Sequence, residues 1–287
     1  MSNNTQMMID GPLIGRRPII ETLQKHLRDE TCVLLVGAAG VGKTAILQEL
    51  MAAAKVSPRY RRPIYCSSVK TVKECLEWVA ATLHAECGDS IVSAAMGPRH
   101  KWLPANKGTA FWRKTPMRVL CRIVMPKLRV GRYTLVVDHL SPLRSNGHAF
   151  FERLVMELKV PVIAAVRGVQ PADIGKLWWL SHVFAEIQVP PLNPDQTRDL
   201  IEQVLLNYRV DLPDRAEFVR TIARVSRGNP GVITRVCRRA ADRRYRMGNR
   251  TSLRLLMLDL QLGDLQSRFE KDACVPVRDS EEPTALG

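Results

Sequence analysis

The sequence lacks any apolar run that approaches the roughly 20 residues needed for a membrane-spanning helix. Its first residues also lack the charged and then apolar pattern of an export signal. Its seven cysteines are odd in number and form no Cys-x-x-Cys pair, which excludes a disulfide scaffold and indicates reduced thiols. We therefore expect a cytoplasmic protein with no membrane partner. Hydrophobic residues make up 46% of the 287 positions, enough for one large or two small folded domains.

Acidic residues are missing from one long stretch and scarce in another. Residues 90–137 contain no Asp or Glu but ten Lys and Arg, and residues 235–254 contain eight Arg and one Asp. These two stretches together carry a formal charge of +17, so the remainder of the chain sums to −2 and the whole to +15. A local excess of this kind favours a polyanionic partner such as a nucleic-acid backbone. The alternative is a solvated face whose counter-charges lie elsewhere in the fold.

Short apolar runs alternate with helical patterns over the first two thirds of the chain. Strands are predicted at 32–36, 64–67, 133–137, 161–166 and 183–189. Because helices separate them, we expect a parallel five-stranded sheet covered on both faces. After Pro190 and Pro191 only helical patterns follow. The predicted domains are a flexible arm (1–12), an α/β domain (13–191), an all-helical domain (192–270) and a disordered acidic tail (271–287).

The strongest motif is GxxxxGK followed by Thr, between the first predicted strand and a helix. Glycines let the backbone curl so that its N–H groups converge, and the helix N-terminus adds positive potential, so the motif predicts a phosphate site. Within it, Lys43 neutralises the outer phosphates and the Thr44 hydroxyl can bind Mg²⁺. The predicted nucleotide-binding residues of this loop are Gly37, Ala38, Ala39, Gly40, Val41, Gly42, Lys43, Thr44 and Ala45.

A second acid is needed to hold the metal, and Asp138 is placed to supply it. The residue follows the apolar run 133–137, so it lies at the carboxyl end of a predicted strand, where parallel α/β sheets bind ligands. Thr44 and Asp138 are therefore the predicted metal ligands. Four further side chains, Cys66, Cys75, His84 and Cys87, have spacings that fit no standard zinc site, and burial is the better interpretation of them.

With these motifs in place, residues 13–262 resemble P-loop ATPases of the AAA+ class, nearest the Orc/Cdc6-like and STAND (NB-ARC-like) branches. Ile14, Gly15 and Arg16 look like the box that lies beside the adenine in these families. Arg167 looks like the residue at the sensor-one position, where STAND proteins often have an arginine that can reach the γ-phosphate, and Pro230 looks like the lid proline that closes over the nucleotide. The resemblance implies ATP with Mg²⁺, a five-stranded P-loop core and a C-terminal helical lid.

The chain departs from this family pattern at three places. His139 replaces the acid that usually follows the Walker B Asp; its imidazole is either a substitute base or turned elsewhere. Pro230 and Gly231 occupy the place of the sensor-two arginine, for which Arg235 is at best a substitute. No arginine finger is evident over residues 176–182. We therefore expect ATP to be hydrolysed slowly, by the set Lys43, Asp138, Arg167 and His139.

Two groups of arginines are predicted to contact nucleic acid. The helical pattern places Arg118, Arg122 and Arg129 on the polar side of one helix, and it places Arg235, Arg239, Arg243 and Arg246 on one face of another. Both groups fit phosphate backbone or an acidic partner, and a solvated face is the alternative for each. Among these cations, Trp102, Phe111 and Trp112 either stack on nucleic acid or pack on their own domain.

Two functions follow from the sequence. The first is a nucleotide-gated ATPase switch that assembles on DNA or on a separately encoded partner, or with copies of itself, as accessory proteins of transposition and replication do. The second is a signalling or defence module of the STAND type that binds a protein partner without nucleic acid, in which case the basic stretches are incidental.

Overall fold

The computed structural model describes residues 13–88, 108–143, 145–210, 212, 214–247, 250–252 and 254–259. The predicted arm at 1–12, the predicted tail at 271–287 and Trp102 lie outside the described residues. The chain divides into two compact units, with the division between Leu192 and Asn193.

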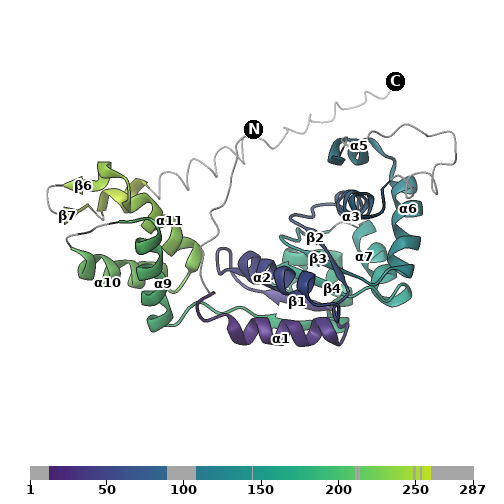
Figure 1. Ribbon diagram of the computed structural model, residues 1–287, viewed down its shortest axis with the longest axis horizontal. Helices are drawn as coiled ribbons and strands as arrows, with labels where there is room; N and C mark the ends of the chain where they lie inside the picture. The colour runs from purple at the N-terminus through teal and green to yellow at the C-terminus, as the bar shows by residue number, and fades with distance from the viewer. Residues whose placement is uncertain are drawn as a thin grey trace, which may run out of the picture. The chain divides into compact units, whose positions relative to one another are not determined.

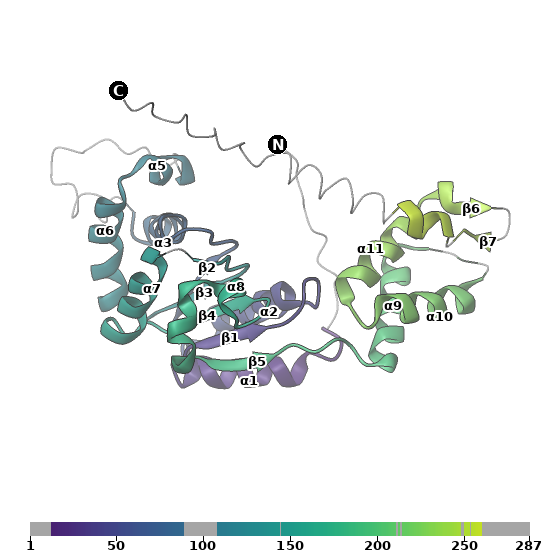
Figure 2. The same cartoon turned by 180° about the vertical axis from the view of Figure 1, so that it is seen from behind.

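The first unit is built on a parallel five-stranded sheet with the strand order β2-β3-β4-β1-β5 (Figures 1 and 2). The strands are β1 (Val33–Val36), β2 (Arg62–Cys66), β3 (Tyr133–Val137), β4 (Val162–Val166) and β5 (Ala185–Gln188). The predicted parallel sheet of five strands is thus confirmed. Because β3 and β4 are neighbours and β4 also pairs with β1, the ends of these three strands lie side by side.

Helices cover both faces of the sheet, so the central strands are buried completely. One face packs against α1 (Arg17–Arg28) and α2 (Lys43–Val56). The other packs against α3 (Val72–Cys87), α5 (Gly108–Lys114), α6 (Met117–Val130) and α7 (Ser145–Glu152). Successive residues of β1 alternate between these two cores: Leu34 lies in the second core, and Val33 and Leu35 lie in the first.

The segment between β3 and β5 is less regular. A π-helical turn, η1 (Arg153–Glu157), continues α7, and the short α8 (Pro171–Ile174) leads into the 3₁₀ segment η2 (Lys176–Val183) before β5. Between α8 and η2, Gly175 approaches the loop after β3 so closely that a Cβ atom on it would lie 2.3 Å from the Leu143 carbonyl oxygen. A parallel bridge between Leu143 and Gly175 ties the two segments together.

The second unit begins with three mutually packed helices, α9 (Pro194–Asn207), α10 (Arg215–Ser226) and α11 (Pro230–Ala240). Asn193 starts α9 with a capping box, in which its side chain accepts from the Gln196 N–H and the Gln196 side chain accepts from the Asn193 N–H. Asn229 caps α11 through the N–H groups of Gly231 and Val232. A 3₁₀ turn η3 (Arg243–Tyr245), strands β6 (Arg246–Met247) and β7 (Arg250–Thr251) and a helix over 254–259 follow.

The second unit differs from the prediction at its C-terminal side. It is not all helical, because β6 and β7 pair as an antiparallel hairpin. The predicted single helix face of Arg235, Arg239, Arg243 and Arg246 is also wrong, since α11 ends at Ala240 and Arg246 lies in β6. The Asp242 side chain accepts from the Arg244 N–H, a local bond that competes with continuation of a helix.

Two predicted absences can be compared with the described residues. No helix among them is long and apolar enough to cross a membrane. The same residues hold no group of three or more His, Cys, Asp or Glu side chains that could bind a metal ion. Cys66 and Cys75 are fully buried, as the burial interpretation expects.

Gly175 and Gly88 offer a matched test of the close approach between the two segments. Both have a φ of 61° with an extended ψ, but a Cβ on Gly88 would meet nothing within 4 Å. Gly88→Ala should lower the free energy of unfolding by the backbone strain alone, about 1–3 kcal/mol. Gly175→Ala should lower it further, because the loop after β3 must move. Urea unfolding checks both variants, and equal losses would contradict this account.

Candidate nucleotide-binding site

The loop between β1 and α2 is a glycine turn that presents its backbone. Gly40 and Gly42 adopt left-handed φ values of 78° and 102°, which residues with side chains rarely adopt. Gly37 allows close packing, since a Cβ there would lie 3.0 Å from the Val189 carbonyl oxygen. The residues at the tip, Ala38, Ala39 and Gly40, are exposed. The predicted phosphate loop thus has the turn, the exposed tip and the following helix that its motif requires.

Lys43 is buried beneath this loop at the start of α2. Its Nζ donates to the carbonyl oxygens of Gly37, at 2.6 Å, and of Ala38, at 2.9 Å. Burial lowers the pKa of the Lys43 ammonium, the charge of Asp138 opposes that shift, and the charge of Arg167 adds to it. Asp138 after β3 and Arg167 after β4 therefore both influence the pKa of the Lys43 ammonium, although Arg167 itself is exposed.

Asp138 directly follows β3 and is only 1% exposed. Its Oδ2 accepts from the Tyr65 hydroxyl at 3.0 Å, while its Oδ1 is buried and has no hydrogen-bond partner among the described residues. A buried carboxylate oxygen without a partner is unfavourable unless a cation or donor reaches it. This orphaned oxygen fits the predicted metal site, for which Asp138 and the Thr44 hydroxyl supply the oxygen ligands that Mg²⁺ prefers.

His139 faces this same site. Its Nε2 lies 3.4 Å from Thr44 Oγ1 and 3.7 Å from Asp138 Oδ2. The residue has a φ of 54°, a left-handed conformation that His tolerates better than most residues do, and its side chain is 66% exposed. The structure therefore brings together Lys43, Thr44, Asp138 and His139 as the sequence predicts, with the imidazole beside the two proposed metal ligands.

Arg16 has a contact that the sequence did not reveal. Its guanidinium is buried and donates to the carbonyl oxygens of Pro190, at 2.8 Å, and of Val41, at 2.9 Å. Burial lowers the pKa of this guanidinium. Arg16 therefore ties the phosphate loop to the segment after β5, while the neighbouring Gly15 turns the chain with a φ of 67° and Ile14 is half-buried.

Tyr65 is a residue of this site that the sequence does not predict. Its hydroxyl orients Asp138, and burial together with the nearby Asp138 charge raises the Tyr65 pKa, so the hydroxyl stays protonated and donates. Tyr65 lies one residue before the end of β2, and this position could have identified it, because β2 pairs in register with β3. Local sequence patterns do not predict which strands are neighbours in the sheet.

The other predicted site residues lie in two places. Arg118, Arg122 and Arg129 are exposed on α6 of the first unit. The second unit contains Pro230 as the first residue of α11, Arg235 exposed on that helix, Arg239 near its end, Arg243 in η3 and Arg246 in β6. The nucleotide contacts of Pro230 and Arg235 stay predictions.

Trp112 is 1% exposed and packs edge-on against Phe111 and His84, so its stacking on nucleic acid is excluded.

Comparisons with known proteins fit this geometry. The chain is similar to Cdc6p from Pyrobaculum aerophilum, with 15% identity and a TM-score of 0.53 over 83% of this chain and 64% of that one. It is also similar to the Orc1 protein of Aeropyrum pernix, solved in complex with DNA, with 17% identity and a TM-score of 0.55 over 85% of this chain and 64% of that one. At these identities the likeness shows the fold alone, and this chain spans just under two thirds of either protein. A search of curated proteins found no match.

The family assignment rests on a match of a different kind. A family model described as the AAA ATPase domain matches residues 12–205. That span contains Arg16, the phosphate loop, Asp138 and Arg167, and it covers well over half of the chain. The resemblance to AAA+ P-loop ATPases is thereby confirmed, and the protein belongs to the AAA ATPase domain family.

Proposed function

We propose that this protein binds ATP at the phosphate loop, hydrolyses it slowly and acts as a nucleotide-gated switch that assembles on DNA or on a protein partner. The observation that carries the proposal is the buried Asp138 carboxylate, one oxygen of which has no hydrogen-bond partner among the described residues. His139 lies beside both this carboxylate and Thr44, and the negative charge of Asp138 favours the charged form of Lys43. An exposed phosphate loop next to a half-satisfied buried carboxylate suits a phosphate chain bound with a cation.

Each residue of the site has a distinct task in this proposal. The backbone N–H groups of residues 38–44 receive the phosphates, and Lys43 exchanges its two carbonyl acceptors for phosphate oxygens. Thr44 and Asp138 would hold Mg²⁺, which offsets phosphate charge when bound. Tyr65 fixes one oxygen of Asp138 and so leaves the other for the site. Arg167, exposed after β4, would contact the terminal phosphate.

Slow hydrolysis follows from the groups around the attacking water. His139 takes the place of an acid, and its imidazole lies against Thr44 and Asp138 instead of projecting free of them. Its backbone is held in a left-handed conformation, which fixes the direction of the side chain. Segment η2, which covers the residues where an arginine finger was considered, contains no arginine. The site therefore holds the phosphates better than it activates water.

The proposed partner is DNA, contacted by a homo-oligomer or together with a separately encoded protein. The similar Orc1 structure is a complex with DNA, and this chain carries its own excess of positive charge. A protein-binding signalling module is the second candidate. It is favoured by Trp178 and Trp179, which are 41% and 64% exposed and pack edge-on against each other, and by the exposed Met156.

Lys43→Ala tests the nucleotide site directly. The variant removes the buried ammonium, and ATP affinity should fall by about 10- to 100-fold because charge-assisted hydrogen bonds to phosphate are lost. Titration with a fluorescent ATP analogue measures this change. Lys55→Ala, an exposed lysine near the other end of the same helix, is the control and should bind as the unaltered protein does. Unchanged affinity of Lys43→Ala would exclude this loop as the ATP site.

His139→Glu tests the cause of slow turnover. A carboxylate at this position supplies the missing base, so the steady-state rate of ATP hydrolysis should rise about 10-fold or more. His139→Asn is the matched control, because Asn tolerates the left-handed backbone but is no base. The account is wrong if the Glu variant shows no gain, or if the Asn variant gains as much.

Arg16→Met tests whether the buried guanidinium positions the phosphate loop. The change leaves the carbonyl oxygens of Val41 and Pro190 without their donor, so the free energy of unfolding should fall by about 2–4 kcal/mol. ATP affinity, measured where the variant is fully folded, should fall as well. Arg17→Met removes an exposed arginine one residue away and should change neither quantity. A destabilised Arg16 variant with unaltered ATP affinity would show that the contact is structural only.

A further inference from the structure

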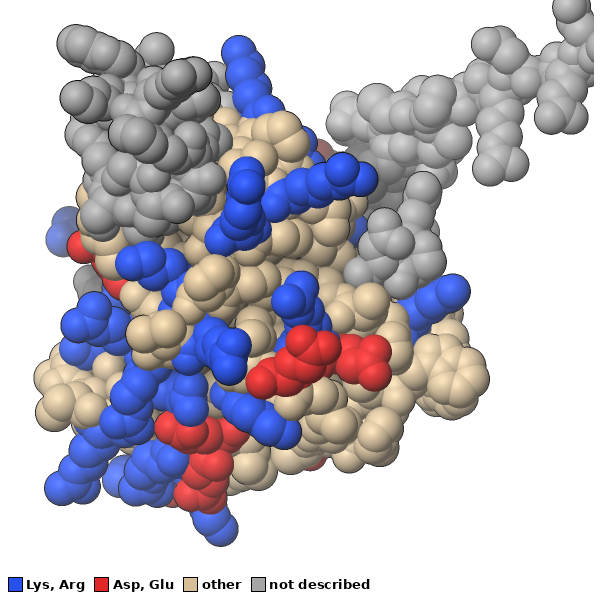
Figure 3. Space-filling view, turned by 90° about the vertical axis from the view of Figure 1, so that its right-hand side faces the viewer, with Lys and Arg blue, Asp and Glu red and all other residues tan. Residues whose placement is uncertain are grey.

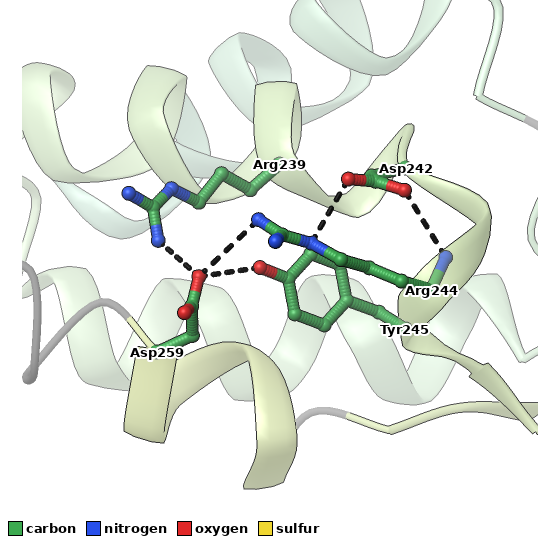
Figure 4. A network of polar contacts seen from close by, with 5 residues as sticks. All are labelled: Arg239, Asp242, Arg244, Tyr245 and Asp259. Carbon is green, nitrogen blue, oxygen red and sulfur yellow. Dashed lines mark hydrogen bonds and ion pairs between the residues drawn. The ribbon is translucent and has the colours of Figure 1, made fainter.

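The two arginine-rich surfaces of this protein differ in how they are neutralised. In the second unit, Asp259 pairs with both Arg239 and Arg244 and accepts from the Tyr245 hydroxyl (Figure 4). Arg244 also pairs with Asp242 at 2.9 Å and stacks over the Tyr245 ring. Asp242 and Asp259, the carboxylates close to these arginines, therefore already form ion pairs within the second unit. Part of the positive charge of residues 235–254 is thus satisfied within the fold.

The arginines of α6 have no such partners. Arg118, Arg122 and Arg129 are exposed, and none of them forms an ion pair with any acid in the described part of the chain. Residues 90–137 contain no Asp or Glu at all. Figure 3 shows the side of the first unit on which α6 lies, with Lys and Arg spread over the surface and fewer acidic groups among them.

These three arginines form one stripe, which we call the α6 stripe. At 3.6 residues per turn they lie within about 40° of each other around the helix axis, and at 1.5 Å per residue the stripe is about 16 Å long. That length corresponds to about five successive phosphates along one strand of duplex DNA. The opposite side of α6, with Leu120, Ile123, Val124 and Leu128, is buried in the core, so the stripe faces outward.

Charge repulsion within the α6 stripe destabilises the isolated protein. Arg118 and Arg122 are one turn apart, and like charges at that spacing destabilise a helix. The core packing of α6 does not require arginine at any of the three positions, because all three side chains lie outside the core. Arg113 and Lys114, exposed at the end of α5, add positive charge close to the start of the stripe. A bound polyanion would remove this repulsion.

The chemistry of the stripe favours phosphate over an acidic protein. Guanidinium groups bind phosphate oxygens in pairs, and protein interfaces usually have an aromatic or apolar centre. Among the described residues, the tryptophan that precedes the stripe in sequence, Trp112, is buried and offers no ring. Helix α6 also contains no Asn, Gln, Ser, Thr, Asp or Glu, the side chains that join arginine in reading base edges. Contacts from this face should therefore be to the backbone and independent of base sequence.

We propose that the α6 stripe is the surface on which this protein holds the sugar-phosphate backbone of duplex DNA, through Arg118, Arg122 and Arg129. This inference rests on the proposed function and sharpens it, because it assigns the DNA contact to one helix of the ATPase unit. The arginine cluster paired with Asp259 contributes less, since its charge is partly neutralised.

The test compares the full chain with a variant in which Arg118, Arg122 and Arg129 are all changed to Gln. The control variant removes the same charge from exposed positions of α9 and α10, as Arg198→Gln, Arg220→Gln and Arg224→Gln. Binding of a labelled 30-base-pair DNA of arbitrary sequence is measured by fluorescence anisotropy at several salt concentrations, and circular dichroism checks that each variant is folded. Polyglutamate is the competitor that represents an acidic protein.

The stripe variant should bind the duplex about 10- to 100-fold more weakly, and its slope of log K against log salt should be smaller by about 2–3, one step for each lost phosphate contact. The control should stay within about threefold of the unaltered chain. The proposal is overturned if the unaltered chain does not bind duplex at low salt, if both variants weaken equally, or if polyglutamate displaces the duplex at equal charge concentration.

ATP binding, measured in parallel, separates this proposal from the proposed function. A stripe variant that binds ATP normally but has lost DNA supports the surface assignment. Retained DNA binding by Lys43→Ala also supports the surface, while its loss of ATP binding concerns only the nucleotide site. If the stripe variant loses both activities although it is folded, the α6 stripe is not a separate docking surface and the assignment fails.

Discussion

The buried carboxylate of Asp138 is the constraint on which the rest of the site depends. A charge at 1% exposure is unfavourable unless hydrogen bonds and opposite charges surround it. The fold supplies Tyr65 from β2 as a donor to one oxygen and the Lys43 ammonium as a nearby positive charge, and it leaves the second oxygen unpartnered. The strand order achieves this, because β2 and β4 flank β3 and β1 lies next to β4.

The phosphate loop is organised by two buried cations that both bind backbone carbonyl oxygens. Lys43 binds those of Gly37 and Ala38 from below, and Arg16 binds that of Val41 together with that of Pro190. In the proposed function phosphate oxygens replace the Lys43 contacts, while the Arg16 contacts join the loop to the segment after β5. Lys43 would then bind the ligand while Arg16 keeps the loop in place, so the loop is preorganised for binding.

Local patterns were sufficient for the strands and for the phosphate loop. Apolar runs and glycine spacing are properties of consecutive residues, so β1, β3 and Asp138 could be placed from sequence. Tyr65, the Arg16 contacts and the pairing of Arg239 with Asp259 depend on residues that are far apart in the chain. The hairpin of β6 and β7 was missed for another reason: the Gly248-Asn249 pair between the strands is a turn signal that the arginine spacing obscured.

Charge counts from the sequence treated the two basic stretches alike, and the structure separates them. Asp259 follows the second stretch in sequence and forms an ion pair with Arg239 within it, while the first stretch contains no Asp or Glu. Helix α6 ends at Val130, and β3, which carries Asp138 at its end, begins at Tyr133. The link is tight, because a Cβ on Gly131 would contact the Tyr133 ring. The α6 stripe and the carboxylate of the proposed metal site therefore belong to one continuous helix-strand element, so the anion and the nucleotide that we propose for these two places would act on the same piece of structure.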